Sequence, residues 1–158
     1  MLSEHYLLAG EKLTVNIKSS LLAAPAVLVM LGGAACTPSN TEGPTLTGTT
    51  WELQQIQLND GQQFVADPPQ NYTAEFSENG ELFVQADCNQ ASGSYTVENE
   101  NLISITAEAS TLAACPEGSI SEEYLRFLNN ANSFFFQDGD LIIEIKFDSG
   151  SLQFSPAG

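Results

Sequence analysis

Histidine is nearly absent from this chain, and its absence excludes the commonest hydrolytic and zinc-binding sites. The single histidine, His5, lies within the first 35 residues, which we interpret below as a signal peptide. The rest of the chain therefore cannot form a Ser-His-Asp or Cys-His arrangement, or a zinc site with a histidine ligand. A Ser-Lys pair would have to use Lys146, which lies in a strand pattern. We expect a protein that is not an enzyme, with no catalytic residue, metal ion or cofactor.

Positive charge is equally scarce. The chain has 4 Lys and Arg against 20 Asp and Glu, which gives a formal net charge of −16 at pH 7. After position 35 only Arg126 and Lys146 are basic. Because nucleic-acid binding depends on Lys and Arg that neutralise phosphates, this composition excludes a nucleic-acid partner. The acidity favours solubility at a cell surface and allows attraction of a basic partner.

No apolar run is long enough for a membrane-spanning helix, which needs about 20 residues. Residues 21–31 read LLAAPAVLVML, with Lys12 and Lys18 before them and the small residues of 32–35 after them. The order basic, apolar and small is typical of an export signal. We therefore predict a signal peptide over residues 1–35 and an exported protein of the cell envelope.

The first of the three cysteines directly follows this signal. Residues 33–36, Gly-Ala-Ala-Cys, resemble a bacterial lipobox, in which the cysteine is lipidated and becomes the mature N-terminus. The competing interpretation is ordinary cleavage after Ala35. We favour lipidation of Cys36, with residues 36–47 as a flexible linker and the membrane as a partner through the lipid. By resemblance to sorting signals, Thr37 implies an outer-membrane lipoprotein that faces the periplasm.

The other two cysteines form an even pair once Cys36 is lipidated. In an oxidising compartment, we predict a disulfide between Cys88 and Cys115. In the chain-entropy account, such a loop closure stabilises the fold by ~3–4 kcal/mol. The alternative is a pair of free, buried thiols.

After residue 48, short β-patterned runs alternate with turn signals, as in all-β sandwiches and barrels. Asn79-Gly80 is the clearest hairpin signal. One helix interrupts the strands: Ser119 can cap it, Glu122 follows three residues later, and apolar residues recur at helical spacing as far as Ala131. The predicted fold class is mainly β, a small antiparallel barrel-like meander with one helix packed across it. The β-patterned runs are residues 50–56, 72–76, 82–85, 93–97, 102–105, 134–136, 141–145 and 152–154.

Three segments carry a family resemblance, namely residues 48–53, residues 87–95 and residues 109–116 with the helix that follows. Together they resemble the META domain, also called the HslJ-like heat-shock domain, of bacterial envelope lipoproteins. Asp87 stands where the family usually has Gly, and Ala114 where Met is common. The resemblance implies an antiparallel, barrel-like domain over residues 48–156. It also implies an association with heat or drug tolerance and envelope stress, and it carries no established catalytic residues.

The polar residues beside Cys88 are the most distinctive of the domain. One interpretation is a recognition rim made by Asp87, Asn89 and Tyr95. The other is structural: Asn89 adopts a left-handed or Asx-turn conformation, and Tyr95 packs in the core. In residues 134–136, alternation points Phe135 outward, where it would be a contact candidate.

Acidic residues fall mainly beside Gly or Asn, where turns are expected. Asp138-Gly139-Asp140 would supply only part of a calcium-binding loop. A carboxylate enzyme would need two acidic side chains that converge in a cleft.

We therefore predict a non-enzymatic, lipid-anchored envelope module that binds an envelope protein or a small ligand, or gives structural support under stress. The alternative is a barrel carrier for a small apolar ligand. A deep cavity lined by Phe83, Tyr95 and Phe134 would favour the carrier, whereas an interior filled by these rings would favour the module.

Overall fold

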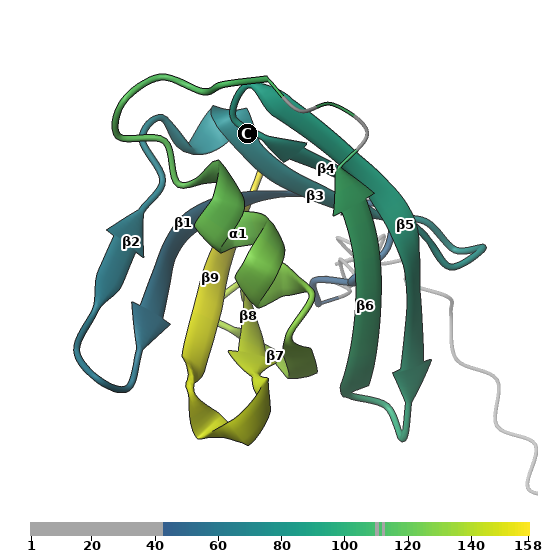
Figure 1. The fold of residues 1–158 in the computed structure, drawn as a ribbon. Helices are drawn as coiled ribbons and strands as arrows, with labels where there is room; N and C mark the ends of the chain where they lie inside the picture. The colour runs from purple at the N-terminus through teal and green to yellow at the C-terminus, as the bar shows by residue number, and fades with distance from the viewer. Residues whose placement is uncertain (1–42, 110, 112) are drawn as a thin grey trace, which may run out of the picture. The chain divides into compact units, whose positions relative to one another are not determined.

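The structure is a computed structural model, and it describes residues 43–109, 111 and 113–158. The predicted signal peptide and Cys36 lie outside the described residues. The described strands form one antiparallel sheet in the order β2-β1-β3-β4-β5-β6-β7-β8-β9, and β1 also pairs with β9. This pairing closes eight strands into a barrel, with β2 added beside the second half of β1 (Figure 1). The predicted fold class is confirmed.

The elements follow the chain with short connections. The strands are β1 (Thr50–Leu58), β2 (Gln63–Val65), β3 (Tyr72–Phe76), β4 (Glu81–Ala86), β5 (Asn89–Glu98), β6 (Leu102–Ala109), β7 (Ala131–Gln137), β8 (Asp140–Ile145) and β9 (Gly150–Pro156). The helix α1 (Ser121–Leu128) lies between β6 and β7, and 3-10 turns occur at Pro69–Asn71 and Lys146–Asp148. No helix among the described residues is long and apolar enough to cross a membrane.

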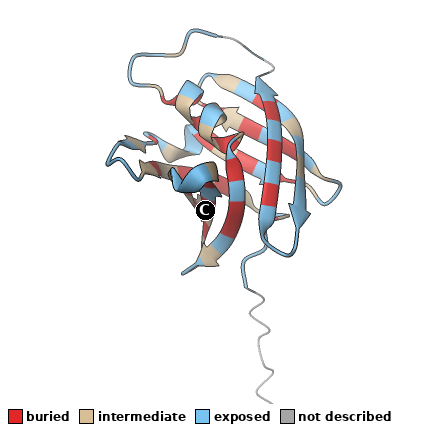
Figure 2. Cartoon of the chain, turned by 60° about the horizontal axis from the view of Figure 1, so that its bottom comes forward, coloured by how far each residue is buried: buried red, intermediate tan, exposed pale blue. Residues whose placement is uncertain are grey.

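Alternation along the strands builds the core. Figure 2 shows buried and exposed residues taking turns along the barrel strands. In β1, Trp51 and Leu53 point inward, as predicted, and both are fully buried. Ile56 is also buried although it is three positions further on. The register against β9 shifts between Leu53 and Gln55, and this bulge turns the inward face by one residue.

Turn chemistry fixes the hairpins. Gln137 pairs with Asp140, so β7 and β8 are joined by Asp138 and Gly139, whose φ values of 55° and 97° suit a type I′ turn. The Asp140 carboxylate accepts hydrogen bonds from Gln153 and from a neighbouring serine of β9. This acidic run is therefore part of a hairpin. The hairpin predicted at Asn79-Gly80 connects β3 and β4.

The helix is present, but the prediction of its limits was wrong. α1 begins at Ser121 after an N-cap, Ile120, that makes no side-chain capping bond. Ser119 precedes this cap, although its hydroxyl accepts a bond from the Ser121 N–H at 3.3 Å. Ala131, which continues the apolar spacing, lies in β7. The spacing continued because both elements bury that side of the chain.

The buried face of α1 is aromatic. Tyr124 is fully buried and contacts the rings of Tyr72 and Phe154. Its hydroxyl has no hydrogen-bond partner within the described part of the chain, and burial raises its pKa. The helix packs against β4 and β6, and it therefore covers the part of the barrel that these two strands form.

The start of the described chain also packs on the barrel. Leu46 is buried, and its carbonyl accepts the Trp51 indole N–H at 3.0 Å. Thr47 forms an isolated bridge with Phe76. Both residues belong to the segment interpreted as a linker, so packing against the barrel begins two residues before Gly48. The Thr- and Pro-rich composition around these residues gives no sign that Leu46 belongs to the core.

Candidate functional site

The predicted cysteine pair is joined in the structure. Cys88 and Cys115 form a disulfide with their Cα atoms 5.4 Å apart. Cys88 lies in the turn between β4 and β5, and Cys115 lies in the connection from β6 to α1. The bond therefore fastens the segment that leads into the helix to a strand end. We call this region, made by residues 87–89 with Thr111, Ala113 and Cys115, the disulfide corner.

Asn89 is the clamp of the disulfide corner. Its Oδ1 accepts the Ala113 N–H at 2.8 Å and the Thr111 hydroxyl at 3.2 Å. Its Nδ2 donates to the Ala113 carbonyl at 3.1 Å and to the Cys115 sulfur at 3.2 Å. Both ends of the amide are thus used inside the protein, which supports the structural interpretation of Asn89.

Asp87, rather than Asn89, has the left-handed backbone, with φ 56°. The prediction was therefore wrong about which residue makes the turn, because Asn89 already belongs to β5. The backbone N–H of Asp87 donates to the Asn71 carbonyl at 2.7 Å, and its carboxylate accepts the Asn71 amide at 3.2 Å. Asp87 is thereby fastened to the start of β3.

Tyr95 is not part of the same site. It lies six positions along β5 from Asn89, or about 20 Å at the usual rise of a strand. Its hydroxyl donates to the Ser77 carbonyl at 2.8 Å, and its ring meets Phe76 edge-on at 5.0 Å. Burial, and secondarily the charge of Glu78, raises its pKa. The structure therefore brings Asp87 and Asn89 together but places Tyr95 at another turn.

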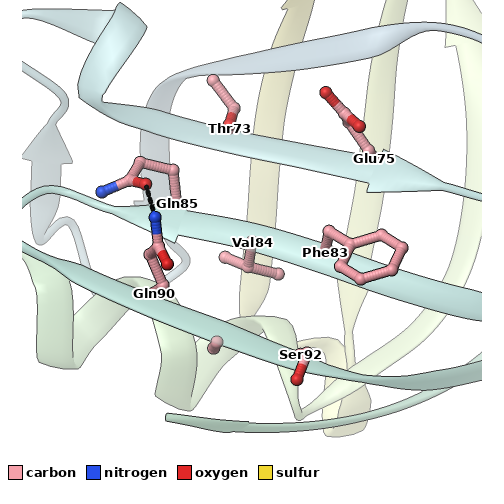
Figure 3. A pocket seen from close by; sticks show the side chains of 8 residues that line it. Thr73, Glu75, Phe83, Val84, Gln85, Gln90 and Ser92 are labelled. Carbon is pink, nitrogen blue, oxygen red and sulfur yellow. Dashed lines mark hydrogen bonds between the residues drawn. The ribbon is translucent and has the colours of Figure 1, made fainter. Parts of the chain in front are cut away.

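A shallow hollow of about 380 Å³ lies on the outer face of β3, β4 and β5 (Figure 3). The register places Glu75, Phe83 and Ser92 in one row across the strands. Thr73, Gln85 and Gln90 form the next row. Since neighbours in an antiparallel register share a face, all six side chains point outward. We call this surface the outer-face hollow.

Phe83 is the aromatic centre of the outer-face hollow, with 49% of its surface exposed. Gln90 donates to the Gln85 amide oxygen at 3.3 Å, and Gln85 donates to the Asp87 carbonyl at 2.5 Å. Thr50 donates to the Glu75 carboxylate at 2.9 Å. The polar groups around the ring are thus held in place from both sides.

The sequence contained a signal for the outward position of Phe83. Leu82 and Val84 flank it and are both buried, so strand alternation points the ring between them to the outside. The carrier hypothesis requires Phe83 to line an internal cavity, and the outward position of the ring contradicts this. Phe135 does point outward as predicted, with 42% of its surface exposed. Among the described residues, no three carboxylate, thiol or imidazole side chains come together to hold a metal ion.

Comparisons with known proteins concern the fold. The family model of the META domain matches residues 44–157. An NMR structure of a protein from Burkholderia xenovorans is similar, with a TM-score of 0.57 and 20% identity over 71% of this chain and 83% of that one. A crystal structure of a DUF4847 family protein from Bacteroides vulgatus has a TM-score of 0.50 and 13% identity, over 70% and 93% of the chains. No curated protein matches this chain.

Proposed function

Because the chain belongs to the META domain family, we propose that it is a non-enzymatic envelope module that binds an uncharged polar ligand of the glycan type on its outer-face hollow. The observation that carries this proposal is Phe83, a half-exposed ring set among fixed amide and hydroxyl groups. A single exposed ring is common on protein surfaces, whereas exposed apolar surface rimmed by polar groups marks ligand-binding grooves, and the ring of Phe83 has such a rim. The family supports the module, and the hollow supports the ligand class.

The chemistry of the hollow favours a sugar. A pyranose ring has an apolar C–H face that can lie on Phe83 and a rim of hydroxyls. Amides such as Gln85 both donate and accept hydrogen bonds, so they match hydroxyl groups. Glu75 in the hollow and the net charge of −16 repel anionic polymers. A neutral glycan strand has an apolar ring face for Phe83, hydroxyl groups for the amides, and no negative charge that Glu75 would repel.

The export signal and the lipid on Cys36 remain part of the proposal. Their support is the lipobox-like run at residues 33–36, which precedes the described residues. With the lipid in an outer membrane, the barrel would face periplasmic glycan. Roles in stress or drug tolerance are supported by the family resemblance alone. Mass analysis of the mature N-terminus tests the anchor separately from the binding.

The carrier alternative finds little support in the barrel. Its test was a deep cavity lined by Phe83, Tyr95 and Phe134. The structure places Phe83 outside, Tyr95 against the turn at Ser77 and Phe134 in the core. Large rings occupy the interior, among them those of Trp51, Tyr72, Phe76, Tyr124 and Phe154.

The binding proposal is tested by titrating the mature full-length protein with chitotetraose, a neutral oligosaccharide, and following amide resonances by NMR. We expect shifts at β3, β4 and β5, and a loss of affinity of about tenfold in Phe83→Ser, the equivalent of 1.4 kcal/mol. Phe135→Ser is the matched control, because it removes a ring of similar exposure from β7. Chitotetraose binding that is undetectable, or equal in both variants, would contradict the proposal.

A further inference from the structure

A second hollow, of about 330 Å³, lies where α1 ends and β8 meets the connection to β9. Its lining includes Arg126 and Lys146, the only basic residues after position 35. They are brought together because Lys146 donates its backbone N–H to the Asn130 carbonyl at 2.8 Å, just after the helix. All the positive side chains after position 35 thus border one depression, which we call the cation hollow.

Neither cation of this hollow forms an ion pair with an acidic side chain of the described residues. Glu122 and Glu123 precede Arg126 by four and three positions, a spacing that permits ion pairs on a helix. The Arg126 guanidinium instead lies 4.5 Å from the centre of the Phe127 ring. Lys146 also borders a different, neighbouring hollow that contains Glu98, yet it forms no ion pair with any described residue. In a chain of 20 acidic residues, it is unexpected that two cations border one hollow without an acidic partner among the described residues.

Phe147 adds an apolar surface to the same hollow. Its side chain is 97% exposed, and its backbone is left-handed, with φ 62° and ψ 27°. For a bulky L-residue, this conformation is unfavourable by about 1–2 kcal/mol. The ring gains no burial that would offset this. Residues that break a local rule without a structural gain are expected at functional sites.

The loop that carries Phe147 is held in place. The Ser149 hydroxyl donates to the Lys146 carbonyl, and the Ser149 carbonyl accepts the Asn59 N–H at 3.0 Å. The Asn59 amide donates to the Asp148 carbonyl at 2.6 Å. Lys146 and Phe147 are therefore presented by a loop that is fastened to the end of β1.

From this geometry we infer that the cation hollow binds a small organic anion that carries an apolar group, with the anion between Arg126 and Lys146 and the apolar group on Phe147. Hydrogen bonds from charged donors to carboxylate or phosphate are about twice as strong as neutral ones. A volume of about 330 Å³ admits a single small ligand. The net charge of −16 repels anions of high charge at long range, which restricts the class to ligands with one or two charges. The hollow shares no residue with the outer-face hollow.

The experiment titrates the mature full-length protein with phenyl phosphate, with inorganic phosphate and benzyl alcohol as half-ligands, and follows amide resonances by NMR. We expect phenyl phosphate to bind with a Kd of about 1 mM or tighter, with shifts at Arg126 and Lys146. Each half-ligand alone is expected to bind at least tenfold more weakly, because it lacks one of the two contacts.

Variants separate the contributions. We expect Arg126→Gln and Lys146→Gln each to weaken phenyl phosphate binding by about tenfold, and Phe147→Ser to weaken it by a smaller factor. Phe135→Ser, which removes an exposed ring elsewhere, leaves it unchanged. Phenyl phosphate that does not bind at about 10 mM, or that binds equally to the Arg126→Gln/Lys146→Gln double variant, overturns the inference. Because Phe83 takes no part, chitotetraose binding can fail or succeed independently.

Discussion

The disulfide corner and the cation hollow each contain distinctive polar side chains. In the first these side chains have hydrogen-bond partners within the protein, and in the second they have no acidic partner among the described residues. In the disulfide corner, Asn89 uses its amide oxygen and nitrogen on the segment from Thr111 to Cys115. In the cation hollow, Arg126 and Lys146 have no acidic partner among the described residues. A polar group whose hydrogen bonds are all made within the protein stabilises the fold, and no ligand is needed to account for its presence. One that is left unpaired at the surface is available to a ligand.

The largest effect should come from cutting the disulfide corner open. We expect Cys88→Ser with Cys115→Ser to lower the free energy of unfolding by ~3–4 kcal/mol, because the unfolded chain regains the freedom of the closed loop. Urea unfolding measures this change. A reducing agent should lower the stability of the wild type similarly and leave the double variant unaffected. An unchanged urea midpoint in the variant would show that the corner owes its structure to hydrogen bonds alone.

A smaller effect is expected from the clamp. Asn89→Ala should lower the free energy of unfolding by about 2 kcal/mol, since several hydrogen bonds are lost together. Asn132→Ala, at an exposed position of β7, is the control and should change stability by less than about 0.5 kcal/mol. Asn89→Ala should leave chitotetraose binding intact in the folded protein. If Asn89→Ala lost chitotetraose binding but kept its stability, Asn89 would be a recognition residue, and the disulfide corner would no longer differ from the cation hollow in this respect.

The smallest effect should have the opposite sign. Phe147→Gly is expected to be about 1 kcal/mol more stable than Phe147→Ala, because glycine adopts a left-handed backbone without a Cβ clash. Both variants lack the ring, so their difference in thermal unfolding isolates the backbone. Both should also bind phenyl phosphate more weakly than the wild type. If glycine gives no gain over alanine, the Phe147 backbone is unstrained and the contrast between the two regions is weaker.

Local patterns gave the part of the fold that local physics decides. Period-two alternation placed Trp51 and Leu53 inward, and Asn79-Gly80 marked a real hairpin. Cysteine parity led to the pair that the structure joins. The limits of α1 were missed because Ser119 has the composition of a cap but lies one residue too early.

The site was harder to predict, because it depends on contacts between distant segments. Arg126 and Lys146 are 20 positions apart and meet only through the return of β8 beside the end of the helix. No pattern in the sequence around either residue predicts that they border the same hollow. Asn89 was singled out correctly as unusual, but only its hydrogen bonds show that the reason is structural. Phe83 could have been assigned to the outside from Leu82 and Val84 alone.

The pairing of β1 with β9 has a consequence for how this protein is made. Trp51 and Pro156 are partners in the register, so the seam joins segments from opposite ends of the domain. Contacts of such long sequence separation form slowly, because the intervening polypeptide must be ordered first. During synthesis, β1 is formed before β9 and keeps one edge without its partner strand until the end of the domain has been made. Until then that edge is a target for aggregation, so a chaperone that shields nascent strands should matter more for this chain than for a helical bundle of equal size.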